Sequence, residues 1–219
     1  MNLIDATSVS LLSSDANPPP AAAEDCPTAV TFDPATHCYR FRGTRLISVT
    51  QAIQAAGLID TEWYTEAARQ RGRAVHLAVH FDAEGDLDES SVSPLIRPYL
   101  EAARSFKRDT RFVTELTEAR VWALHAGYAG TIDHLGCIAK NQRVLVDWKT
   151  GLIPEWARLQ TAGYAHTFPN GAAFLRYAVQ LKPDGGYKIT SFEPQEFRRD
   201  LTDFLACVRV ARLQEEQHV

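Results

Sequence analysis

The segment Val144-Leu145-Val146-Asp147-Trp148-Lys149-Thr150-Gly151 is an apolar run that ends in two side chains of opposite charge. Aliphatic and β-branched residues favour a strand, and side chains alternate between its two faces. Asp147 and Lys149 are therefore expected on one face at the strand's end. If the preceding strand pairs antiparallel through the loop at 140–143, Asp133 lies at the same end. The sequence thus predicts two carboxylates and one ammonium group in a small space.

A divalent cation would account for this cluster. Two convergent carboxylates are costly to bury unless a cation compensates them, and oxygen ligands suit Mg²⁺ or Mn²⁺. For each residue alone, the simpler interpretation is an ion pair between Asp147 and Lys149, with Asp133 as an ordinary turn residue. Gly130, three residues before Asp133, would allow another segment to approach closely at this point.

The chain around this segment predicts an α/β fold. Three β-rich runs form an antiparallel meander and two more meet at a Pro-Asp-Gly-Gly turn as a hairpin, over 119–124, 128–138, 144–148, 174–181 and 187–192. A smaller hairpin flanks residues 33–36. Helices are predicted from after residue 48 or 50 to 57, and over 62–81, 94–108, 155–168 and 194–216, with an acidic loop at 82–89. This order indicates a mixed β-sheet flanked by helices.

Length and composition indicate one catalytic domain. The 219 residues, 45% of them apolar, suffice for one core, which we place at 28–219. Residues 1–27 are rich in Ser, Ala, Asp and Pro and are expected to form a flexible tail. The four cysteines form no CxxC pair, which favours a reducing cytoplasm. No apolar run approaches the roughly 18 residues that span a bilayer, so no membrane association is expected.

The net charge of −4 argues against binding nucleic acid by bulk attraction, so local charge placement must carry any such binding. Two predicted helices carry basic stripes. One contains Arg104, Lys107, Arg108 and Arg111, for which an ordinary solvated helix face is the favoured interpretation. The other places two guanidinium groups and two imidazoles in a row on one helix face: Arg69, Arg73, His76 and His80. Such a row suits a DNA backbone whose phosphates lead to a bound metal. His80 is equally compatible with an exposed polar face.

The motifs GTID at 130–133 and VLVDWKTG at 144–151 resemble those of the PD-(D/E)XK nuclease superfamily, in its RecB-like and phage-type exonuclease branch. The resemblance implies a restriction-endonuclease-like core, in which Asp133 and Asp147 hold the metal and Lys149 orients or activates the attacking water. It also implies that the backbone carbonyl of Trp148 is a metal ligand. The segment 71–76 is similar to the family's histidine-bearing helix, which implies a metal ligand at His76.

Two further features extend the resemblance. The run 160–164 resembles the family's Q-x-x-x-Y element and implies catalytic roles for Gln160 and Tyr164. Trp156 lies four residues before Gln160, so the three side chains share a helix face that could approach the substrate backbone, although taken alone the two aromatic residues would more often be core. Glu118 matches a position where relatives have an acid aimed at the metal or at water, with Glu115 as the alternative.

The expected function is that of a Mg²⁺- or Mn²⁺-dependent DNA exonuclease with one or two ions and no iron-sulfur cluster, since the cysteines are isolated. It would act at the ends of double- or single-stranded DNA in recombination, replication or repair, in the cytoplasm of a bacterial or phage-infected cell, with a recombination protein as a possible partner. The residues expected to contact DNA are Arg69, Arg73, Thr150 and Trp156. A structure-specific endonuclease on the same scaffold and a non-catalytic DNA-binding or interaction module are the alternatives.

Overall fold

The computed structural model describes residues 30–60 and 65–217. The predicted tail at 1–27, the predicted start of the domain at residue 28 and the first residues of the helix predicted over 62–81 lie outside this range. Within it, no helix is both long and apolar enough to cross a bilayer.

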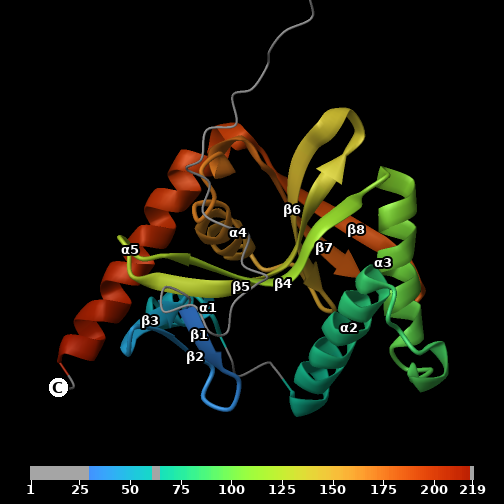
Figure 1. Ribbon diagram of the computed structural model, residues 1–219, viewed down its shortest axis with the longest axis horizontal. Helices are drawn as coiled ribbons and strands as arrows, with labels where there is room; N and C mark the ends of the chain where they lie inside the picture. Colours follow the sequence, from blue (N-terminus) through green and yellow to red (C-terminus); the bar gives the residue numbers. More distant parts are fainter. Residues whose placement is uncertain (1–29, 61–64, 218–219) are drawn as a thin grey trace, which may run out of the picture.

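The described residues contain a mixed sheet of eight strands, in agreement with the predicted fold class (Figure 1). Its order is β1-β2-β3-β5-β6-β7-β8, and β4 pairs with β5 alone. The pairs β3–β5 and β6–β7 are parallel, and the others are antiparallel. The strands are Val30–Asp33 (β1), Cys38–Phe41 (β2), Thr44–Ser48 (β3), Val113–Ala123 (β4), Tyr128–Ile138 (β5), Gln142–Lys149 (β6), Leu175–Leu181 (β7) and Tyr187–Phe192 (β8).

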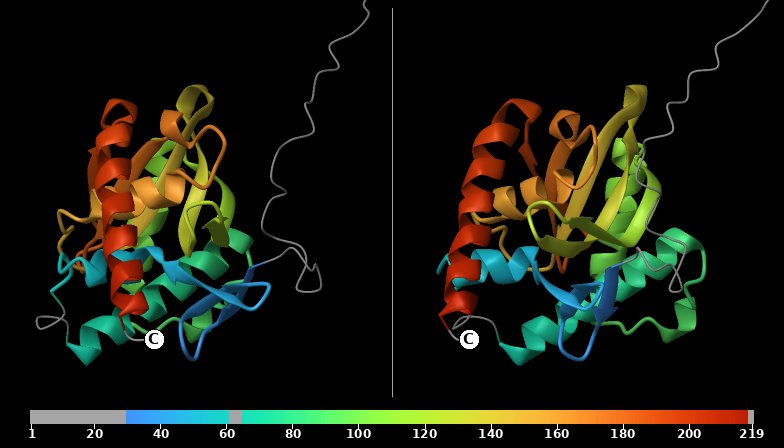
Figure 2. Two further views of the ribbon diagram at one scale, coloured as in Figure 1. Left: turned by 90° about the vertical axis from the view of Figure 1, so that its left-hand side faces the viewer. Right: turned by 60° about the vertical axis from the view of Figure 1, so that its left-hand side comes forward.

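Helices cover both faces of the sheet, on either side of it in Figure 1. Val49–Ala55 (α1), Ala157–Ala165 (α4) and Phe197–Glu216 (α5) pack on one face, where the long α5 contacts both α1 and α4 (Figure 2). Glu66–Glu84 (α2) and Arg97–Thr110 (α3) pack on the other. Strand β6 shows the division directly: Val144, Val146 and Trp148 join the core under α2 and α3, whereas Leu145 joins the core under α4 and α5.

The strand β5 has β4 along one side and two different strands along the other. Its first residues pair with β3, through Ile47↔Tyr128 and Ser48↔Ala129. Its last residues pair with β6, from His134↔Val146 to Ile138↔Gln142. Residues 130–133 lie between these pairings, and in the described chain no strand pairs with them on that side. We call this point the fork of the sheet; Asp133 lies at it.

The predicted meander, both hairpins and all five helices are present, with shifted ends. Strand β3 was not predicted, and β4 begins six residues earlier than expected. Helix α2 continues through the start of the predicted acidic loop to Glu84, because Gly85 supplies the left-handed C-cap at φ 78°. Helix α3 begins at Arg97 rather than Pro94, and residues 194–196 form a 3₁₀ turn before α5. Of the two starts predicted for α1, after residue 48 or after residue 50, the structure has the first, with Ser48 as N-cap in a capping box with Gln51.

Candidate active site

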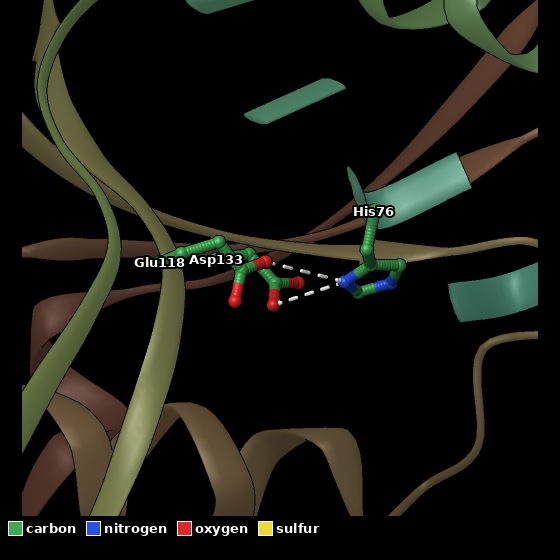
Figure 3. A group of neighbouring side chains, drawn as sticks. All are labelled: His76, Glu118 and Asp133. Atoms are coloured by element: carbon green, nitrogen blue, oxygen red, sulfur yellow. Dashed lines mark ion pairs between the residues drawn. The ribbon is translucent and has the colours of Figure 1, made fainter. Parts of the chain in front are cut away.

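Two carboxylates and one imidazole meet where α2 crosses β4 and β5: those of Glu118, Asp133 and His76 (Figure 3). His76 Nδ1 lies 3.2 Å from Asp133 Oδ1 and 3.9 Å from Glu118 Oε1. Its Nε2 lies 3.1 Å from the carbonyl oxygen of Trp148, the residue between Asp147 and Lys149. The imidazole therefore bridges one carboxylate and the backbone of β6, with the second carboxylate close by.

Asp133 is also tied directly to β6 across the fork of the sheet. Its Oδ2 accepts a hydrogen bond of 2.7 Å from the backbone N–H of Trp148. This bond replaces a strand pairing at the point where the ladder between β5 and β6 has ended at His134↔Val146. The two strands are thus held together at the site by a side chain, which places the Asp133 carboxylate beside the Asp147–Lys149 segment.

Glu118 reaches the cluster through an unusual backbone conformation. The ladder pairs Thr117 with His134 and Ala119 with Ile132, so Glu118 stands opposite Asp133. Its φ is 45°, in the left-handed region that non-glycine residues in strands rarely adopt. Glu115, the alternative acid, contacts Arg143 and Cys137 instead. Of the two acids considered from the sequence, the structure brings Glu118 to the cluster.

A second group of contacts leads from β6 to α4. Asp147 and Lys149 share a face of β6, and Lys149 Nζ lies 2.7 Å from Asp147 Oδ2. Lys149 also donates a 2.9 Å hydrogen bond to Gln160 Oε1, and Gln160 Nε2 donates to the Tyr164 hydroxyl at 3.4 Å. The ammonium stands 5.2 Å from the centre of the Trp156 ring, in a cation–π contact. Asp147, Gln160 and Trp156 therefore contact the lysine directly, and Tyr164 contacts Gln160.

Gly130 makes room for this arrangement. A Cβ at this position would lie 2.6 Å from a ring carbon of Tyr164 and 3.3 Å from a methyl group of Val49. Val49 of α1 and Tyr164 of α4 thus approach β5 closely at Gly130. The glycine predicted to allow a close approach does so here.

Burial and mutual repulsion change the proton affinities of the cluster. Burial and the nearby Asp133 raise the pKa of Glu118 to about 7, and burial raises that of Asp147 to about 6 despite the Lys149 ammonium. Burial alone would lower the pKa of His76, but Asp133 and Glu118 outweigh it and raise the pKa to about 9. Burial also opposes ionisation of Asp133, whose pKa is nevertheless lowered by His76, Lys149 and the Trp148 N–H.

These residues fit a hard divalent cation. Ligand atoms of His76, Glu118 and Asp133 all lie within 4.8 Å of one another. Asp147 Oδ2 is buried and, among the described residues, receives an ion contact from Lys149 but no hydrogen bond. At neutral pH the His76 imidazolium itself lies between Asp133 and the Trp148 carbonyl, which marks this space as one that favours positive charge. A donor set of carboxylates, one carbonyl and one imidazole suits Mn²⁺ and Mg²⁺.

A cavity of about 920 Å³ opens beside the cluster, between α2 and the start of α4. Its lining includes His76 and Lys149 together with all four residues predicted to contact DNA: Arg69, Arg73, Thr150 and Trp156. Arg73 also makes an exposed ion pair of 2.9 Å with Glu66. Arg158, which was not predicted, lines the same cavity and pairs with Asp200 and Asp203 on α5.

Other charged residues singled out in the sequence lie elsewhere. The basic stripe of α3 is largely neutralised, because Arg104 pairs with Asp82, Glu89 and Glu101, and Lys107 pairs with Asp82. His80 does not join the cluster; its Nδ1 lies 3.1 Å from Thr117 Oγ1. Arg104 and Lys107 are only 27% and 17% exposed and pair with Asp82 on α2, so the favoured interpretation of a solvated helix face is wrong for these two residues.

Sequence reasoning missed His134, which is buried behind the site. Its Nδ1 accepts a 3.0 Å hydrogen bond from the indole N–H of Trp148, and burial lowers its pKa to about 3. The neutral ring thereby fixes the side chain of Trp148, whose backbone contacts both Asp133 and His76. Alternation places residue 134 on the opposite face from Asp133, and this is the one sequence signal that could have indicated a supporting role.

No protein-family model matches the chain, and no curated protein matches it. Among solved structures, a putative exonuclease from Eubacterium rectale has a TM-score of 0.48 and 12% sequence identity, over 76% of this chain and 81% of the other. An alkaline exonuclease, LHK-Exo from Laribacter hongkongensis, has a TM-score of 0.32 and 14% identity, over 79% and 93%. Its complex with dAMP gives the same values. Both neighbours carry the name exonuclease.

Proposed function

We propose that the chain is a divalent-metal-dependent nuclease that hydrolyses DNA phosphodiester bonds. The observation that carries this proposal is the convergence of Asp133, Glu118 and His76 on the strand end that bears Asp147 and Lys149. Partly buried carboxylates that meet next to a lysine and an open cationic cavity suit a cation and a phosphate better than a purely structural ion pair. We assign it to the PD-(D/E)XK superfamily, with a restriction-endonuclease-like core, on the motifs at 130–133 and 144–151.

Each residue has a distinct part in this proposal. Asp133, Asp147, His76 and the Trp148 carbonyl would hold one or two Mg²⁺ or Mn²⁺ ions, with Glu118 as a further ligand or base. The ion would supply charge stabilisation at the scissile phosphate and lower the pKa of water. Lys149, held by Gln160 and Trp156, positions the attacking water and offsets negative charge in the transition state. Tyr164 keeps Gln160 in place.

We further propose that the substrate is DNA with a free end. Arg69, Arg73, Thr150 and Trp156 line the cavity beside the cluster and would contact the phosphate backbone and bases of the bound strand. An end-processing role in recombination, replication or repair would place the protein in the cytoplasm of a bacterial or phage-infected cell, with a recombination protein as a possible partner. The test below separates this role from endonuclease activity.

End-labelled linear double-stranded and single-stranded DNA should be incubated with the protein beside covalently closed circles, in Mg²⁺, in Mn²⁺ and in a chelator. The expected result is loss of linear DNA with either metal, no loss with the chelator, and intact circles. Cleavage of closed circles would favour the endonuclease alternative. No cleavage of any substrate with either metal would contradict a nuclease and favour a DNA-binding module.

Variants of matched shape test the residues themselves. Asp147→Asn, Lys149→Met and Glu118→Gln should each lower the cleavage rate by at least about 10²-fold, because each removes a charge from the reacting centre. Glu115→Gln is the matched control, since Glu115 lies on the same strand as Glu118 but contacts Arg143. Single-turnover rates of the purified variants decide the matter. Wild-type cleavage by Asp147→Asn or Lys149→Met would refute the proposed mechanism.

A further inference from the structure

Helix α2 contacts two consecutive residues of β4 with two imidazoles one helical turn apart. His76 approaches the Glu118 carboxylate at 3.9 Å, and His80 Nδ1 shares a hydrogen bond of 3.1 Å with Thr117 Oγ1. The first contact belongs to the proposed metal cluster. The second belongs to no function described so far, although both partners are only partly exposed to solvent.

The contact at Thr117 adjoins the most strained point of the site. Glu118 has a φ of 45° within a strand, and a non-glycine residue in this region typically costs about 1–3 kcal/mol unless its surroundings hold it there. Just before it, the register of β4 against β5 shifts between Thr114 and Leu116. The backbone around Glu118 is therefore irregular, so the direction of the Glu118 carboxylate depends on what holds this stretch of β4 in place.

We propose that His80 is a positioning residue for Glu118. Its hydrogen bond to Thr117 anchors the irregular stretch of β4 to α2, so that the Glu118 carboxylate stays beside Asp133 and His76. The inference rests on the proposed function, because it assigns Glu118 to the metal cluster. Hydrogen bonds that orient a metal ligand without binding the metal typically matter: removing one lowers the metal affinity by about 10- to 100-fold.

The other contacts of His80 do not account for its position. Its Nε2 lies 3.5 Å from Glu84 Oε2, and its ring lies against Phe81, but both residues belong to α2 itself. The Thr117 contact crosses from the helix to the strand that carries Glu118. A helix-surface role alone would leave the metal affinity unchanged when this contact is lost.

The experiment measures Mn²⁺ binding directly, without DNA, from the loss of the free-ion signal in electron paramagnetic resonance titrations. His80→Phe keeps a ring of similar size without the hydrogen bond, and Thr117→Val keeps the shape without the hydroxyl. Each should weaken Mn²⁺ binding by about 10-fold. His80→Asn and Thr117→Ser retain a polar partner and should bind close to the wild-type affinity. The double variant His80→Phe with Thr117→Val should be no worse than either single change.

Glu84→Gln is the control on the same helix and should bind Mn²⁺ as the wild type does. Urea unfolding shows whether each variant is folded under the titration conditions, and Thr117→Val serves if His80→Phe does not fold. Wild-type affinity in folded His80→Phe and Thr117→Val, together with weakened binding in Asp133→Asn, would overturn this inference and leave the proposed function standing. A wild-type protein that binds no Mn²⁺ would overturn both.

Discussion

At the scale of single residues, the proton on His76 competes with the cation of the proposed metal site for a ring nitrogen. The ring contacts Asp133 on one side and the Trp148 carbonyl on the other, and its raised pKa of about 9 keeps it protonated at neutral pH. Coordination through a ring nitrogen requires the loss of that proton, and the carboxylates must also be ionised. Metal binding at the proposed site would therefore be linked to proton release.

The first prediction is that stabilisation by Mg²⁺ increases with pH. Glu118 and Asp147 have folded-state pKa values of about 7 and 6, above their ordinary 4.5 and 3.8, so their contribution to metal-free stability is lost as pH rises through this range. His76, raised from 6.5 to about 9, loses its contribution between those values. The rise in Tm caused by Mg²⁺ should grow from pH 6 to about 9, by thermal unfolding. A rise that shrinks with pH would contradict the linkage.

The second prediction concerns the backbone of Glu118. Glu118→Gly and Glu118→Ala both remove the carboxylate, but glycine adopts a φ of 45° without strain and alanine does not. The glycine variant should be more stable to urea than the alanine variant by about 1 kcal/mol. Equal stability, or a more stable alanine variant, would show that the left-handed conformation of this residue costs little.

The same residue shows where sequence reasoning stops. Asp133, Asp147 and Lys149 follow from strand alternation, because their neighbouring strands are regular up to the site. The choice between Glu115 and Glu118 does not, since it depends on a register shift after Thr114 and on one positive φ. Neither the register shift nor the positive φ can be predicted from the residue types, because no glycine or asparagine occupies the left-handed position.

At the scale of elements, the site depends on how closely α4 approaches β5. Tyr164 lies against Gly130, and Tyr164, Gln160 and Lys149 form one chain of contacts. A displacement of α4 at its tyrosine is therefore transmitted to the ammonium group on β6.

The third prediction tests this coupling with Gly130→Ala. The added Cβ would meet the Tyr164 ring at 2.6 Å, so the ring must move and Gln160 with it. The cleavage rate should fall by about 10-fold or more, with a destabilisation of about 1–3 kcal/mol. Gly151→Ala is the control, because a Cβ there meets nothing within 4 Å. Equal single-turnover rates for the two variants would separate the α4 contact from catalysis.

The elements that sequence reasoning missed are those defined by distant partners. The meander and the hairpins show alternation and turn residues in the sequence itself. Strand β3 is short, begins with two exposed residues, Thr44 and Arg45, and pairs in parallel with β5 some eighty residues away. The start of β4 is also hard to predict from the sequence. Its first residues alternate between exposed and half-buried positions in the structure, but apolar and polar residue types do not alternate there.

At the scale of the whole molecule, α5 is joined to the sheet by a fully buried ion pair. Arg176 on β7 donates to Asp200 on α5 at 2.8 Å, and neither side chain is exposed. Asp200 also accepts from Arg158, which lines the cavity beside the site. The pair therefore links the C-terminal helix, the sheet and the wall of the cavity.

The fourth prediction is that Asp200→Asn lowers the free energy of unfolding by about 3–5 kcal/mol, because it removes the carboxylate that the buried Arg176 guanidinium contacts. Asp203→Asn is the control: its side chain is 44% exposed and its loss should cost at most about 1 kcal/mol. Urea unfolding measures both. A small effect at Asp200 would mean that Arg176 finds another partner or reaches water.

The fork of the sheet has a consequence for the order of folding events. The two parallel pairings, β3 with β5 and β6 with β7, join segments separated by whole helices, and such long-range contacts form slowly during folding. The cluster also needs a long-range contact of its own, because His76 reaches Asp133 from α2. We expect a growing or partly folded chain to be inert, so that the proposed hydrolytic activity would be gained late in folding.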